Sequence, residues 1–115
     1  MSDYFRFYCT LYFTHSKQDH TMATVTKHLI LSGRVQGVGF RHFTKTKAEQ
    51  AGLTGWVYNK PNGDVEAVLQ GDEEAVEIVV QALEEGPRMA RVDSIREHHS
   101  SDKIGQAYPS FDVRR

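Results

Sequence analysis

The spacing of the hydrophobic residues changes several times along the 115-residue chain, and the order of these changes most constrains its fold. Apolar side chains at every second position predict strands, whereas apolar side chains at every third or fourth position predict helices. By this criterion we expect strands at 27–35, 54–59, 64–70, 89–99 and 110–115, and helices at 40–52 and 72–85. Phe111 and Val113 in the last strand are expected to point inward.

Turn and capping residues agree with these boundaries. Asn62-Gly63 is a strong signal for a two-residue hairpin between the second and third strands. Gly52 is placed to end the first helix, Asp72 to cap the start of the second, and Gly86-Pro87 to end it. The resulting order is β-α-β-β-α-β with an extra C-terminal strand. It predicts a ferredoxin-like α+β sandwich, in which two helices cover one face of a mostly antiparallel sheet.

The composition narrows the class of protein. A chain of 115 residues with 39% hydrophobic and 25% charged residues fits one globular domain. The net charge of the chain is -1, so we do not expect the basic surface that is typical of a nucleic-acid-binding protein. No run of about 18 apolar residues predicts a membrane span. Cys9 is the single cysteine, which excludes an internal disulfide and a thiolate zinc site and fits a reducing, cytosolic compartment.

Residues 1–22 differ in character from the rest, because they hold half of the aromatic residues. We expect a flexible N-terminal extension at 1–22 and one domain at 23–115. A signal peptide is disfavoured, because Asp3 precedes and Arg6 interrupts the apolar stretch. Met22 is a second candidate start of translation.

The segment GRVQGVGFRHF, residues 33–43, joins the first strand to the first helix. Gly37 and Gly39 can adopt positive φ, which lets successive backbone N–H groups converge on one anion. Glu49 is the first acidic residue in the predicted helix at 40–52, more than two turns after its start. A helix N-terminus carries about half a positive charge, which nothing acidic in the first turn offsets. Arg41 adds a full cation there, so both the donors and the charge favour a bound phosphate. The candidate phosphate-binding residues are Gln36, Gly37, Val38, Gly39, Phe40 and Arg41.

The glycines alone are equally consistent with a simple tight turn. The segment is not a P-loop, because no Gly-Lys-Ser/Thr follows at the required spacing. Nor is it a dinucleotide-binding fingerprint, because the third glycine is missing. The acid-free helix start and Arg41 are what favour an anion site over the turn.

Two strings resemble the signature segments of the acylphosphatase family: LSGRVQGVGFR at 31–41 and GWVYNKPNGDVEAVLQG at 55–71. The resemblance covers about residues 25–115. It implies a small hydrolase, usually monomeric and cytosolic, that needs no metal or other cofactor. Such an enzyme splits an acyl phosphate, the mixed anhydride of a carboxylic acid and phosphoric acid, into carboxylate and inorganic phosphate.

The resemblance also implies catalytic roles for two residues. The family's phosphate-binding arginine maps onto Arg41, and the asparagine that positions the attacking water maps onto Asn59. The loop amides from Gln36 to Phe40 map onto the cradle of the phosphoryl oxygens. For Asn59 taken alone, a strand-end residue that helps the turn is the simpler interpretation. The resemblance does not name the physiological acyl phosphate.

Other side chains near these motifs have structural interpretations. Trp56 and Tyr58 alternate with the candidate asparagine and should pack on the opposite face of the sheet. His42 points about 100° away from the candidate arginine and is expected at the surface. His98 and His99 are adjacent on a predicted strand, so they point to opposite faces and cannot share a metal.

Three alternative functions remain open. Acylphosphatase-like domains that handle carbamoyl phosphate begin long hydrogenase-maturation proteins, whereas this chain ends after one domain. An RNA reader on the same fold would carry aromatic residues on its central strands, and DVEAVLQG at 64–71 has none. A regulatory domain could bind an anion without chemistry, and Asn59 argues only weakly against it.

Overall fold

The computed structural model describes residues 24–98 and 106–115. In chain order the elements are β1 (Thr24–Arg34), α2 (Phe40–Gln50), β2 (Thr54–Asn59), β3 (Val65–Asp72), α3 (Glu73–Glu85), β4 (Arg91–Glu97) and β5 (Phe111–Arg114). The predicted N-terminal extension at 1–22, together with Cys9 and His99, lies outside the described residues.

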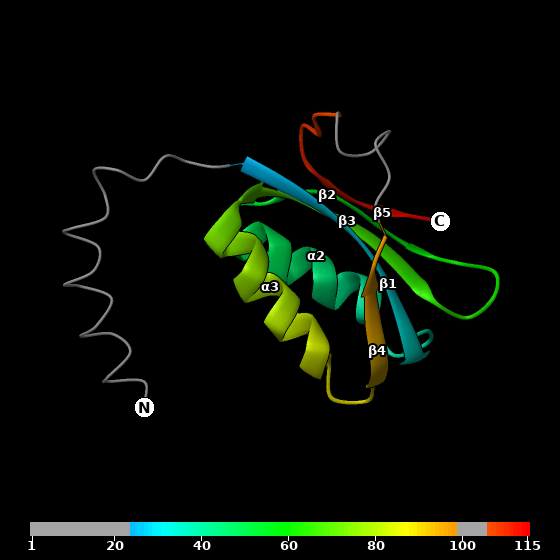
Figure 1. Ribbon diagram of the computed structural model, residues 1–115. Coiled ribbons are helices and arrows are strands. Elements are labelled where there is room, and N and C mark those ends of the chain that lie inside the picture. The colour runs from blue at the N-terminus through cyan, green and yellow to red at the C-terminus, as the bar shows by residue number, and fades with distance from the viewer. Residues whose placement is uncertain (1–23, 99–105) are drawn as a thin grey trace, which may run out of the picture.

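The strands form one sheet in the order β4-β1-β3-β2-β5. The three pairings among β4, β1, β3 and β2 are antiparallel, and β5 alone runs parallel to its neighbour β2. Both helices lie on the same face of this sheet, as Figure 1 shows. The predicted ferredoxin-like α+β sandwich with an extra C-terminal strand is therefore confirmed.

The core lies between the helices and the sheet. Leu31 from β1, Val57 from β2 and Leu69 from β3 are fully buried on the helix-facing side. In α2, Thr44 rather than Phe43 takes the buried position, and its hydroxyl donates a 2.9 Å hydrogen bond to the carbonyl of Phe40. That bond satisfies a polar group which would otherwise be costly to bury.

The predicted turn and the predicted helix cap are both present, but two details of the prediction are wrong. The hairpin between β2 and β3 has a three-residue loop rather than the predicted two-residue one, because its closing bond joins Lys60 N–H to the Asp64 carbonyl at 2.8 Å. A type I turn with Pro61 in its second position, followed by a glycine with positive φ, gives this longer loop. Asp72 stands at the N-cap of α3, yet its side chain makes no capping bond.

Val113 departs from the sequence-based expectation. Phe111 is buried as predicted, but Val113 is 38% exposed. β5 lies at the edge of the sheet beyond β2, and only its first residue is buried. Val113 is therefore a surface residue, and it faces the hollow described below.

Candidate active site

The loop between β1 and α2 has the backbone that its glycines suggest. Gly37 and Gly39 have φ angles of 74° and 78°, in the left-handed region that favours glycine. A Cβ at either position would meet no atom within 4 Å, so the backbone conformation and not crowding requires glycine. Gly39 is the N-cap of α2, which places this left-handed turn directly against the helix start.

The start of α2 offers its N–H groups without a competing side chain. The N-cap residue Gly39 has no side chain that could accept a hydrogen bond from these N–H groups, and the first turn contains no acidic residue. The first N–H groups of a helix have no partner inside the helix, so they remain available to an anion. The opposite arrangement is seen at α3, where Glu73 and Glu74 occupy the first turn.

Arg41 lies in this first turn and is held by a main-chain acceptor. Its Nη1 donates a 3.0 Å hydrogen bond to the carbonyl of Arg114 at the end of β5. Among residues 24–98 and 106–115, no carboxylate forms an ion pair with Arg41. The guanidinium has five N–H donors, so one bond to Arg114 leaves the others for a ligand.

Asn59 ends β2 beside this loop. Its Oδ1 is buried and has no hydrogen-bond partner within the described part of the chain. A buried acceptor left without a partner costs about 1–3 kcal/mol. Such an atom favours a ligand or a water that brings an O–H donor to it.

One hollow of about 280 Å³ brings these parts together. It is lined by Val35, Gly37, Gly39, Phe40, Arg41, His42, Asn59 and Val113. Both candidate catalytic residues thus face the same space, although they are separated by one helix and one strand in the sequence. His42 is exposed, as expected, and stands at the rim.

Two predicted phosphate-binding residues do not line the hollow. Val38 packs against the hydrophobic core. The side chain of Gln36 turns to the neighbouring hairpin, where its Nε2 donates to two main-chain carbonyls. Only the backbone N–H groups of these residues remain candidates for phosphate binding.

A larger hollow of about 500 Å³ lies on the other face of the sheet. Trp56 and Tyr58 line it, which agrees with their predicted position opposite Asn59. The guanidinium of Arg114 already stacks 4.5 Å from the Trp56 ring centre. This hollow has no glycine loop and no helix start, so the smaller one is the better candidate for phosphate chemistry.

A model of the acylphosphatase family matches residues 27–113. The chain belongs to the acylphosphatase family. The acylphosphatase of Alcanivorax borkumensis is 43% identical over 89 residues, which are 76% of this chain and 97% of that relative. The solved structure of an acylphosphatase from Coxiella burnetii superposes with a TM-score of 0.73 at 38% identity, over 79% of this chain and 93% of that one.

A third similarity concerns a much longer protein. The structure of full-length HypF in a phosphate- and nucleotide-bound form matches with a TM-score of 0.74 and 25% identity. The match covers 84% of this chain but 12% of HypF. This acylphosphatase-family chain therefore matches a small part of HypF, whereas it matches nearly the whole length of the two acylphosphatases named above.

Family and fold together support an enzyme that hydrolyses acyl phosphates, which implies a small-molecule substrate and phosphate as a product. Within residues 24–98 and 106–115, no group of three His, Cys, Asp or Glu side chains is arranged to hold a metal ion. In the same residues, neither helix is long and apolar enough to cross a membrane.

Proposed function

We propose that the 280 Å³ hollow is the active site of an acylphosphatase in which Arg41 binds the phosphoryl group and Asn59 positions the water. The observation that supports this most strongly is that one hollow is lined by an uncapped helix start, by Arg41 and by Asn59. Among the described residues, Arg41 has no carboxylate partner and the buried amide oxygen of Asn59 has no hydrogen-bond partner. The first two features attract a dianionic phosphoryl group. The third favours a bound water.

The proposed reaction is a single displacement at phosphorus. The water oxygen forms a bond to phosphorus while the bond from phosphorus to the acyl oxygen breaks, and its electron pair leaves with the carboxylate. Phosphoryl transfer passes through a loose transition state, so positioning and charge stabilisation provide most of the catalysis. The amides of residues 36–40 and the Arg41 guanidinium stabilise the equatorial oxygens.

This reaction requires neither a metal ion nor a strong base. A carboxylate is a good leaving group, so no general acid has to protonate it. Asn59 cannot accept a proton at neutral pH, but its amide can orient the water in line with phosphorus. The phosphoryl group itself takes the proton that the water loses. We therefore propose metal-independent catalysis. The single cysteine of the chain supports the further proposal that the protein is cytosolic. The expectation that it is a monomer stays a prediction.

The alternatives are less well supported. The chain matches 97% of the length of a relative named acylphosphatase and 12% of the length of HypF, so its extent agrees better with the acylphosphatase. An RNA-reading sheet is disfavoured, because β3, the central strand of the sheet, carries no Phe, Tyr or Trp. A purely anion-binding domain would have no use for the unpaired acceptor of Asn59.

Turnover of benzoyl phosphate by the purified chain tests this function. Release of benzoate should follow enzyme concentration, compete with inorganic phosphate and be the same with and without EDTA. Loss of turnover in EDTA, restored by a divalent cation, would contradict the metal-free mechanism. No turnover by the folded protein would contradict the proposed function itself.

A further inference from the structure

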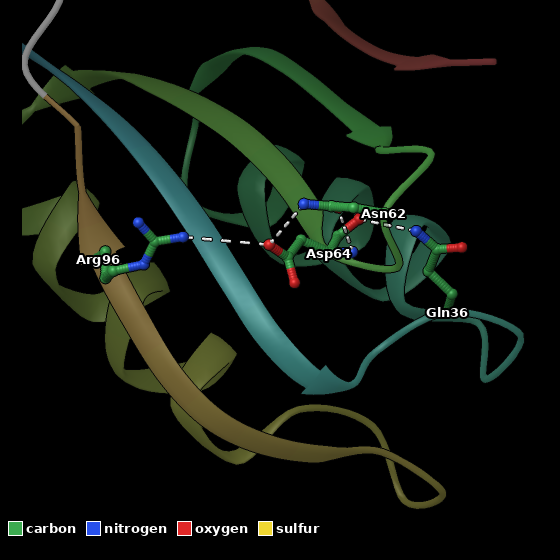
Figure 2. A network of polar contacts seen from close by, with 4 residues as sticks. All are labelled: Gln36, Asn62, Asp64 and Arg96. Atoms are coloured by element: carbon green, nitrogen blue, oxygen red, sulfur yellow. Dashed lines mark hydrogen bonds and ion pairs between the residues drawn. The ribbon is translucent and has the colours of Figure 1, made fainter.

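The side chain of Gln36 joins the two segments of the proposed active site. Its Nε2 donates one hydrogen bond to the Lys60 carbonyl and one to the Asp64 carbonyl, both at 2.8 Å. Figure 2 shows this amide nitrogen directed at the hairpin loop that carries Asn62 and Asp64. Gln36 directly precedes Gly37 of the candidate phosphate loop, and Lys60 directly follows Asn59.

The hairpin loop that accepts these bonds has its own fixed conformation. Lys60 N–H donates to the Asp64 carbonyl at 2.8 Å, and Gly63 N–H donates to the Lys60 carbonyl at 3.1 Å. The Asn62 Oδ1 accepts a 3.0 Å bond from Asp64 N–H, which closes an Asx turn. Both carbonyls that Gln36 reaches therefore belong to a defined turn.

Gln36 uses its donors fully. The amide has two N–H hydrogens, and the two carbonyls account for both. Each carbonyl oxygen has two lone pairs, so it can accept from Gln36 while it holds the turn. The contact between Arg96 and Asp64 in Figure 2 is different, because 4.0 Å at a mostly exposed Arg96 makes a weak ion pair.

We propose that Gln36 is a positioning residue that sets the distance between the phosphate-binding amides and Asn59. The proposal rests on the proposed function, because it gives the side chain a role in placing the water relative to the phosphoryl group. A misplacement of about 1 Å in such an arrangement can cost about 10²-fold in rate. Phosphate affinity depends on the loop and Arg41, and it should change little when the hairpin shifts.

A double-mutant cycle with Gln36→Met and Asn59→Ala tests this role, because coupled residues give non-additive losses. Methionine keeps the length of the side chain and removes both donors. Gln36→Met should lower kcat for benzoyl phosphate by about 10- to 100-fold. Its inhibition constant for inorganic phosphate should stay within about twofold. In the Asn59→Ala background, Gln36→Met should cause no further loss.

Gln70→Met is the matched control. Gln70 also donates through Nε2 to a main-chain carbonyl, that of Gln106 at 2.6 Å, but on the face of the sheet away from the hollow. This variant should retain the wild-type kcat even if it melts at a lower temperature. An equal fractional loss from Gln36→Met with and without Asn59 would show a merely structural role and overturn the inference.

Gln36→Glu provides a second readout if the methionine variant does not fold. The carboxylate has no hydrogen to donate to the two carbonyls, whereas its protonated form regains one O–H donor below about pH 4.3. Its kcat relative to wild type should rise as the pH falls through that value, and a constant ratio would overturn the proposal. An inactive wild type would defeat the proposed function, whereas an active wild type with additive losses defeats this inference alone.

Discussion

Replacement of Arg41 by alanine is expected to lower kcat/KM for benzoyl phosphate by at least about 10³-fold, the scale found for arginines that stabilise a transferring phosphoryl group. The guanidinium is the one cation in the described lining of the hollow, so its loss leaves only amide dipoles for the equatorial oxygens. Competitive inhibition by inorganic phosphate should weaken in parallel. Steady-state kinetics with phosphate as inhibitor measures both effects.

Arg41→Lys separates charge from geometry. Lysine keeps the positive charge but lacks the planar guanidinium group with its fixed set of N–H donors. It therefore cannot donate to the Arg114 carbonyl and to two phosphate oxygens in one plane. We expect this variant to recover part of the phosphate affinity and little of kcat. If Arg41→Ala hydrolyses benzoyl phosphate at the wild-type rate while folded, Arg41 is not the phosphate-binding residue.

Replacement of Asn59 by alanine is expected to lower kcat by about 10²-fold, because the attacking water loses its fixed position. The inhibition constant for phosphate should stay within about twofold, since Arg41 and the loop amides bind the phosphoryl group. The two candidate residues are thus distinguished by which constant changes. Measurement of kcat and of phosphate inhibition on the same preparation is sufficient.

Asn59→Asp is the companion variant. Aspartate has the same size, but its charge repels the phosphoryl oxygens. It should therefore weaken phosphate inhibition as well as kcat, in contrast to alanine. Equal phosphate inhibition of the aspartate variant and wild type would place residue 59 too far from the phosphoryl group to hold the attacking water.

The elements and the loop could be predicted from the sequence because local residues determine them. Alternation of apolar residues predicts which side chains of a strand share a face, and the structure agrees with this at Leu31 and Leu69. The left-handed turn before α2 follows from Gly37 and Gly39, which have few local alternatives. The absence of an acidic residue from the first turn of α2 can be read from the sequence itself.

Contacts between distant segments could not be predicted in the same way. Val113 lines the hollow because the edge strand β5 pairs in parallel with β2. Periodicity predicts the two faces of a strand but not which strand lies next to it. The bonds from Gln36 depend on the three-residue loop at Lys60–Asp64, which was predicted one residue too short. A two-residue loop would place the carbonyls of the hairpin differently. The hydrogen bond from Gln36 to the Lys60 carbonyl, 24 residues away, could therefore not be predicted from the sequence.

The most direct test is a titration of the ¹⁵N-labelled wild-type chain with inorganic phosphate, followed by the amide resonances at constant ionic strength. Binding at the loop should shift the amides of Gly37, Gly39 and Phe40 together and saturably. Gly52 is an internal control, because its φ of 75° and open surroundings match those of Gly37 while it lies at the far end of α2. If Gly37 and Gly39 shift no more than Gly52, or shift equally with added chloride, the loop is not a phosphate site.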